Sequence, residues 1–282
     1  RSLTEVHIRP GGIAQNMQTL KLMTELWPLV LGVVGAIAAV AVALGYVALA
    51  IGTETNGSIV CPANANGVVG IKPTVGLVSR RGIIPISHTQ DTAGPLARTV
   101  TDAALLLETL VHLDPEDSAG RGSSERSYRP DPNQTRLDGV RIGVLRTCSG
   151  AGERPRLDAI YEGAIGQLEA LGATLIDPIE YRPAPEFRPA SYRILLREFK
   201  AGLNDYLAGR PLPADRDSLG DLIALNASRP DELMPLFGQS IFLEAEAISG
   251  LDDPEYSADL EAVQATLRAD LRGIFETHRL DA

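Results

Sequence analysis

Residues 26–51 carry no charged side chain and are rich in Val, Leu, Ala and Gly. Two interpretations fit this pattern. The uncharged run is long enough to cross a bilayer as a membrane helix. Alternatively, the small residues from Gly32 to Gly45 form a closely packed helix in a soluble protein, Gly45 ends it, and Val47 to Ile51 follows as an interior strand. The hydrophobic pattern itself leaves both interpretations open.

Further along the chain, apolar residues predict a strand, a helix and a second strand in succession: Gly139 to Leu145, Leu157 to Leu171 and Ala173 to Ile179. Because elements of these lengths in this order form a parallel crossover, the chain is predicted to have an α/β fold. Helical spacing of apolar residues predicts three more helices, over residues 101–113, 190–207 and 257–279, and Thr99 or Thr101 can cap the first.

Residues 114–138 form a polar tract with Gly, Ser, Arg and Pro, which predicts an exposed loop. The chain has 282 residues, of which 44% are apolar and 22% charged, so it is globular and long enough for one large core or two modest ones. We therefore expect a single domain over residues 1–282.

Composition excludes several functions. The chain has 26 basic and 36 acidic residues and a net charge of −10, which argues against nucleic acid as a partner because a phosphate backbone needs clustered Lys and Arg. Cys61 and Cys148 cannot form a disulfide framework and lack the spacing partners of a zinc site. The four histidines, at positions 7, 88, 112 and 278, are scattered. We expect no metal and no organic cofactor, and a cytoplasmic location unless residues 26–51 attach the chain to a membrane.

Residues 52–74 contain the candidate chemistry. They are rich in Gly, Asn and small residues, which predicts that the stretch continues neither a strand nor a helix, and they include one serine, Ser58. Backbone amides with almost no side chain can converge on one point, as in an oxyanion hole, where donors lie close to the negative charge of acyl transfer. The alternative is a tight turn with a capping serine.

The stretch is one of several blocks that resemble the amidase signature family of serine hydrolases. The blocks are Gly52-Thr-Glu-Thr-Asn-Gly-Ser58-Ile, Gly67-Val-Val-Gly-Ile-Lys-Pro-Thr74, Gln90-Asp-Thr-Ala-Gly-Pro95 and Ala97-Arg-Thr-Val100. The resemblance is dense over residues 51–110. It implies a mixed sheet flanked by helices, and it favours the soluble helix and strand over the membrane helix.

The same resemblance assigns roles to the loop and its activity. It implies that Ser58 is the acyl-forming nucleophile and that the amides of Thr55, Asn56, Gly57 and Ser58 receive the oxyanion. The implied reaction is hydrolysis or transfer of carboxylic amides.

Other catalytic residues of the family have no match in this sequence. The family places a second catalytic serine about two dozen residues before the nucleophile, and that count lands near Val34, where no hydroxyl is present. The family's lysine lies further upstream than this chain extends. Of the three lysines, Lys21 is too close to Ser58 to match, and Lys72 matches a structural residue. An unactivated serine is a poor nucleophile near neutral pH, so weak or absent activity is expected.

Two neighbouring features invite a functional interpretation. Arg80 and Arg81 could contact a substrate carboxylate, although solvation at the surface is favoured. His88 lies beside Gln90 and Asp91, which suggests a catalytic triad, although structural hydrogen bonding is favoured because neighbours in sequence need not face each other.

The sequence therefore predicts an α/β fold of the amidase signature type, incomplete at both ends. Its function is that of an amidase with a serine nucleophile acting on a small-molecule amide, inactive if the chain is truncated or altered. The alternative is a non-catalytic or membrane-anchored binding protein that keeps the loop as scaffold. The sequence identifies neither the amide substrate nor the oligomeric state.

Overall fold

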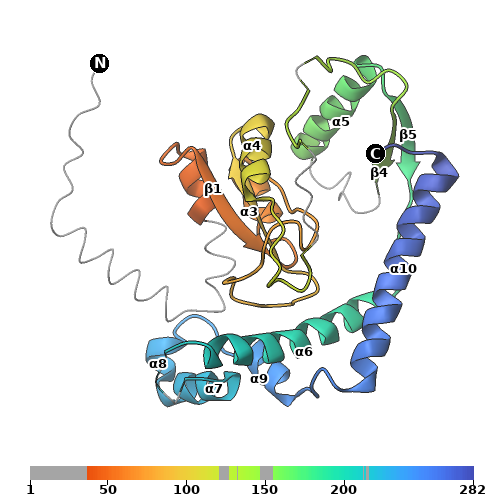
Figure 1. Ribbon diagram of the computed structural model, residues 1–282. Helices are drawn as coiled ribbons and strands as arrows, with labels where there is room; N and C mark the ends of the chain where they lie inside the picture. The colour runs from red at the N-terminus through yellow and green to blue at the C-terminus, as the bar shows by residue number, and fades with distance from the viewer. Residues whose placement is uncertain (1–36, 121–126, 132, 147–154, 212, 214–215) are drawn as a thin grey trace, which may run out of the picture. The chain divides into compact units, whose positions relative to one another are not determined.

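The computed structural model describes residues 37–282, except for 121–126, 132, 147–154, 212 and 214–215 (Figure 1). The chain divides into two compact units. The first comprises Arg1–Arg129 with Glu198–Ile248, and the second comprises Pro130–Arg197 with Ser249–Ala282. The candidate chemistry lies in the first unit.

The first unit contains a three-stranded sheet in the order β1-β3-β2, with both pairs antiparallel. The strands are β1 (Leu49–Glu54), β2 (Val69–Gly70) and β3 (Thr92–Ala97). All six residues of β3 are buried, because the strand is central and both of its faces are covered. The sheet thus brings residues from two distant parts of the sequence side by side.

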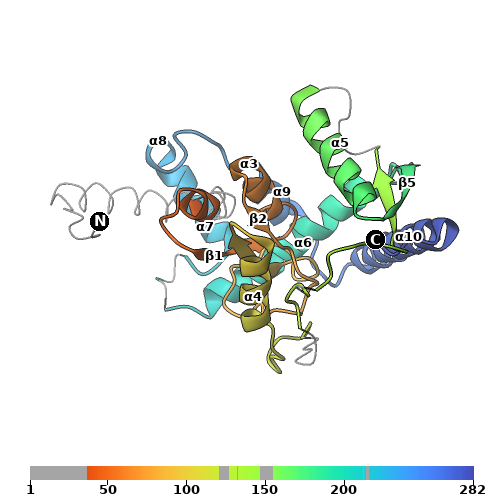
Figure 2. The same ribbon diagram turned by 90° about the horizontal axis from the view of Figure 1, so that it is seen from above.

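Helices cover the two faces of this sheet, and Figure 2 shows α3 (Val60–Asn66) and α4 (Val100–Leu110) on either side of it. Leu96 packs with Ile59 and Ala63 of the α3 region on one face. Ala93 packs with Leu107 of α4 on the other. Side chains alternate between the faces of a strand, so a single buried strand anchors both layers.

The helix predicted to end at Gly45 is confirmed for its described part. Residues 37–43 are helical, and Gly45 has a φ of 75°, a conformation that glycine adopts without steric cost. Ala39 and Val42 are fully buried in the same cluster as Leu96. Residues 26–36 lie outside the described residues. In the part of the chain that the structure describes, no helix is long and apolar enough to cross a membrane.

The rest of the first unit is helical. It contains the end of α6 (Phe187–Ala208), followed by α7 (Leu219–Ser228), α8 (Pro230–Leu233) and α9 (Ser240–Ala247). The rings of Phe199 and Phe242 lie 5.5 Å apart between their centroids and join α6 to α9. This part of α6 lies against residues 85–87, since Glu198 accepts the Ser87 hydroxyl and a Cβ on Gly202 would lie 3.0 Å from Pro85.

The second unit confirms the predicted crossover. Strand β4 (Arg141–Leu145) pairs in parallel with β5 (Thr174–Ile179), and α5 (Pro155–Ala170) connects them (Figure 1). The beginning of α6 and the long helix α10 (Pro254–His278) complete the unit. The predicted α/β class is confirmed, with one antiparallel and one parallel sheet among the described residues.

Two local predictions are wrong. Residues 52–74 were expected to form neither strand nor helix, yet β1 continues to Glu54, α3 forms after the loop, and β2 follows. Pairing of β1 with β3 overrides the weak strand propensity of Gly52, which lies opposite Gly94. Among the described residues, the strand expected to be interior also lies at the sheet edge, and Ile51 is half exposed.

Candidate active site

The loop that carries Ser58 is closed by the side chain of Glu54, the last residue of β1. The Glu54 carboxylate accepts hydrogen bonds from the backbone N–H groups of Gly57 at 2.7 Å, Ile59 at 2.8 Å and Val60 at 3.0 Å. Glu54 is 4% exposed, so these bonds compensate for burial of its charge. One side chain therefore fixes the turn from β1 into α3, with Ser58 inside it.

The amides of the loop do not all have the same role. Gly57, with a φ of 103°, directs its N–H to Glu54. Among the residues that the structure describes, the N–H groups of Thr55, Asn56 and Ser58 have no acceptor. Of the four predicted oxyanion donors, three therefore have no acceptor within the described part of the chain, while the Gly57 amide donates to a carboxylate.

Ser58 is partly buried and lines a narrow cavity with room for about one water molecule. The side chains around it include Glu54, Thr55, Ile86 and Asp91. Within the described residues, the Ser58 hydroxyl has no hydrogen-bond partner, and no lysine or histidine lines this cavity.

Asp91 joins the Ser58 loop to the Gln90–Pro95 block. Its Oδ1 accepts the Thr55 hydroxyl at 2.5 Å, and its Oδ2 accepts the N–H groups of Ile86 and Ser87, each at 2.8 Å. Burial raises the pKa of the Asp91 carboxyl, against the lowering effect of these hydrogen bonds. Because both oxygens are engaged, Asp91 holds the loop in place.

His88 does not form a triad with Asp91. Its Nε2 lies 3.6 Å from Oε1 of Glu198, a fully buried residue of α6. Lys72 donates to the backbone carbonyl of Gln90 at 3.0 Å, as expected of a structural lysine. Sequence reasoning missed Glu54 and Glu198. A carboxylate four residues before the candidate nucleophile was a signal for Glu54, whereas nothing in the sequence pointed to Glu198.

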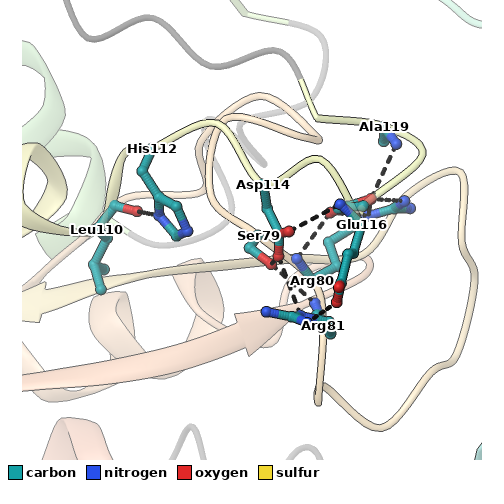
Figure 3. A network of polar contacts seen from close by, with 9 residues as sticks. Ser79, Arg80, Arg81, Leu110, His112, Asp114, Glu116 and Ala119 are labelled. Atoms are coloured by element: carbon teal, nitrogen blue, oxygen red, sulfur yellow. Dashed lines mark hydrogen bonds and ion pairs between the residues drawn. The ribbon is translucent and has the colours of Figure 1, made fainter.

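Arg80 and Arg81 differ in the exposure of their side chains. Arg80 is paired with Asp117 and its side chain is 13% exposed, so it is not the solvated surface residue that was favoured. Its Nε lies 3.1 Å from both carboxylate oxygens, and these hydrogen bonds hold the pKa of Asp117 below its ordinary range. Arg81 is 63% exposed and pairs with Asp114 and Glu116, which agrees with the favoured interpretation. Figure 3 shows Arg80, Arg81, Asp114 and Glu116 near Ser79, whose hydroxyl donates to Asp114 at 2.6 Å.

This network borders an open pocket of about 240 Å³. The pocket shares Ile83 and Asp91 with the small cavity at Ser58, and Pro85 and His88 also line it. A partly buried serine beside a larger open pocket is an arrangement suited to binding a small organic group. The described residues contain no group of three or more His, Cys, Asp or Glu side chains that could hold a metal ion.

Sequence and structure comparisons show the family of this mixed α/β protein. The amidase family model matches residues 38–282, and the chain belongs to the amidase family. A probable amidase of Arabidopsis thaliana is 38% identical over 249 residues, which are 86% of this chain and 47% of the relative. One glutamyl-tRNA(Gln) amidotransferase subunit, from Moorella thermoacetica, is 36% identical over 252 residues, 87% of this chain and 50% of the relative.

Solved structures agree. The peptide amidase of Stenotrophomonas maltophilia is 41% identical with a TM-score of 0.73, over 86% of this chain and 50% of that structure. An amidase family protein from Bacillus anthracis is 32% identical with a TM-score of 0.76, over 86% of this chain and 47% of that structure. The chain spans about half the length of the relatives that it matches.

Proposed function

We propose that this chain carries the nucleophile and the oxyanion-binding loop of an amidase that acts on carboxylic amide C–N bonds. The observation that carries the proposal is the position of Ser58 in a loop fixed by Glu54, next to backbone amides without an acceptor in the described residues. Such amides act at the point where negative charge develops. Membership of the amidase family and similarity to a peptide amidase support a small amide substrate.

The proposed reaction uses the side chain and the backbone of the loop. The Ser58 oxygen bonds to the amide carbonyl carbon as its proton passes to a base, and the carbonyl oxygen becomes an oxyanion. The amides of Thr55, Asn56 and Ser58 stabilise that oxyanion. The C–N bond then breaks as the leaving amine takes up a proton, and water releases the carboxylic acid from Ser58.

The rate of this reaction depends on a base that accepts the Ser58 proton. Among the described residues, no lysine or histidine lines the cavity at Ser58, and a serine hydroxyl needs proton removal to react at a useful rate. We therefore expect slow turnover by this chain, with acylation by a strongly activated reagent proceeding more readily than amide hydrolysis.

A fluorophosphonate probe tests the nucleophile directly. The full chain is incubated with the probe, and the labelled peptide is identified by mass spectrometry. We expect an adduct on Ser58 that is lost in Ser58→Ala. Ser228→Ala is the matched control, because the Ser228 hydroxyl is exposed and only donates to the Leu225 carbonyl at the end of α7.

The outcomes separate the functions. Labelling at Ser58 with measurable release of ammonia from a small primary amide establishes the amidase. Labelling without turnover establishes a nucleophile that lacks its base. If the folded protein is not labelled at Ser58, the proposal fails and a non-catalytic binding protein is the better description.

A further inference from the structure

Glu198 is a fully buried carboxylate in α6 that the proposed reaction does not use. Burial of a carboxylate costs free energy unless the carboxylate is hydrogen-bonded or paired, so its partners show which part of the chain it holds. Its Oε2 accepts the Ser87 hydroxyl, the Thr89 hydroxyl at 3.0 Å and the Thr89 N–H at 3.2 Å. His88 Nε2 lies 3.6 Å from its Oε1. All these partners come from three consecutive residues, 87–89.

Asp91 also holds this turn, through the backbone of Ser87. The Asp91 carboxylate accepts the Ser87 N–H at 2.8 Å, and the Asp91 N–H donates to the Ser87 carbonyl at 2.8 Å. Ser87 is therefore fixed by its side chain to Glu198 and by its backbone to Asp91. Since the other oxygen of Asp91 accepts the Thr55 hydroxyl, a continuous set of hydrogen bonds runs from α6 to the Ser58 loop.

We propose that Glu198 is a positioning residue for the Ser58 loop, acting through Ser87, Asp91 and Thr55. Its role in catalysis rests on the proposed function, whereas its role in ordering the loop does not. The Glu198 charge also raises the pKa of the Asp91 carboxyl, after the larger effect of burial, which agrees with the closeness of the two groups.

A purely structural role for Glu198 is the competing explanation. Gly202, one turn further along α6, lies against Pro85, since a Cβ on Gly202 would come within 3.0 Å of the proline ring. Packing of α6 on the segment before the turn could thus order that segment without Glu198. The two explanations differ in what happens to the distant loop when only the carboxylate is changed.

Glu198→Gln and Glu198→Ala test the proposal, with Leu203→Ala as the control. Leu203 is fully buried in the same helix, so its truncation destabilises α6 by loss of packing and leaves the carboxylate in place. Hydrogen exchange is measured on the full chain for the amides of Gly57, Ile59 and Val60. These amides donate to Glu54 and therefore report loop order.

We expect Glu198→Ala to accelerate exchange at these three amides by about tenfold or more relative to the Leu203→Ala variant at equal global stability. Glu198→Gln should give a smaller change, because its amide oxygen still accepts from Thr89. If Glu198→Ala does not fold, the same exchange measurement is made on Thr89→Val, which keeps the side-chain shape and removes the hydroxyl that donates to Glu198. Equal exchange in the carboxylate variants and the control overturns the proposal.

The rate of fluorophosphonate labelling gives an independent measurement. We expect labelling of Ser58 to slow in Glu198→Ala beyond the change seen in Leu203→Ala, with partial recovery in Glu198→Gln. If the unaltered chain is not labelled, the proposed function fails, while the exchange measurement still decides the role of Glu198 in the loop.

Discussion

The Thr55 hydroxyl donates a hydrogen bond of 2.5 Å to Asp91 although 36 positions separate the two residues. Thr55 belongs to the loop that carries Ser58, and Asp91 belongs to the Gln90–Pro95 block. Antiparallel pairing of β1 with β3 places the ends of these strands next to each other, since Glu54 lies opposite Thr92. Two separate blocks of the sequence thereby form one site.

Replacement of Asp91 tests this connection. Asp91→Ala removes the acceptor for the Thr55 hydroxyl and for two backbone N–H groups, and we expect the free energy of unfolding to fall by about 2–4 kcal/mol. Asp91→Asn keeps an acceptor for the amides, and its NH₂ group can donate to the Thr55 oxygen, so a smaller loss is expected. Urea unfolding at pH 7 measures both. A loss in Asp91→Asn as large as in Asp91→Ala would contradict this assignment.

The raised pKa of Asp91 also predicts a pH dependence. A carboxyl with a pKa above its unfolded value binds its proton more tightly in the folded state. Its contribution is therefore fully present below the unfolded pKa and is lost as the pH rises through the folded pKa. Asp91→Asn cannot titrate at this position, so it should not show this loss of stability. The unfolding free energies of the unaltered chain and of Asp91→Asn are measured at several pH values from 4 to 7. As the pH rises, the stability of the unaltered chain should fall relative to that of the variant.

Glu54 offers a separate test of the loop. Glu54→Ala leaves three backbone N–H groups without their acceptor, so we expect a loss of about 2–4 kcal/mol in the free energy of unfolding and loss of labelling at Ser58. Glu54→Gln keeps one amide oxygen as acceptor, but its NH₂ group faces a backbone donor. An intermediate loss is therefore expected by thermal unfolding. Unchanged stability in Glu54→Ala would show that the carboxylate does not hold the turn.

The sequence predicts much of the fold because local patterns determine it. The crossover formed by β4, α5 and β5 follows from apolar spacing, and the Thr99 cap of α4 follows from its preference for the position before a helix. The hydroxyl of Thr99 accepts the N–H of Asp102, as expected. The edge position of β1 was not predictable, because it depends on pairing with a strand about 40 residues away.

The candidate site was less accessible to sequence reasoning. The motif identifies Ser58 and its neighbours, but the use of the Gly57 amide by Glu54 depends on backbone geometry. Glu198 lies more than 100 residues beyond Ser87 in a helix with no motif, so only the tertiary structure brings its carboxylate to the turn. Similarly, nothing local shows that Arg80 is covered while Arg81 is exposed.

The Arg80–Asp117 pair predicts sensitivity to acid. Hydrogen bonds from Arg80 lower the pKa of Asp117, so the unfolded state binds more protons and stability rises with pH. This stability is present above the unfolded pKa and is lost as the pH falls toward the folded pKa. Asp117→Asn should lower the unfolding free energy by about 1–3 kcal/mol at pH 7, with a smaller difference at pH 3.

Glu108→Gln is the control for Asp117→Asn, because its partner Arg129 is 63% exposed and such pairs contribute about 0–1 kcal/mol. Equal effects of the two substitutions in urea unfolding would argue against this role.

Gly94 in the central strand predicts a steric limit on the sheet. A Cβ at this position would lie 2.0 Å from the Ile71 carbonyl oxygen and 2.9 Å from Cδ of Pro73. Ile71 and Pro73 both belong to the segment directly after β2, so a side chain at Gly94 would force this segment away from β3. Because the main chain must move, we expect Gly94→Ala to cost about 3 kcal/mol or more, at or beyond the upper range for overpacking of a core. Gly238→Ala in the same unit is the control, since a Cβ there meets nothing within 4 Å, and it should change stability by no more than about 0.5 kcal/mol. Thermal unfolding of the two variants checks the comparison, and a Gly94→Ala protein that melts with the unaltered chain would refute the close approach of the two segments.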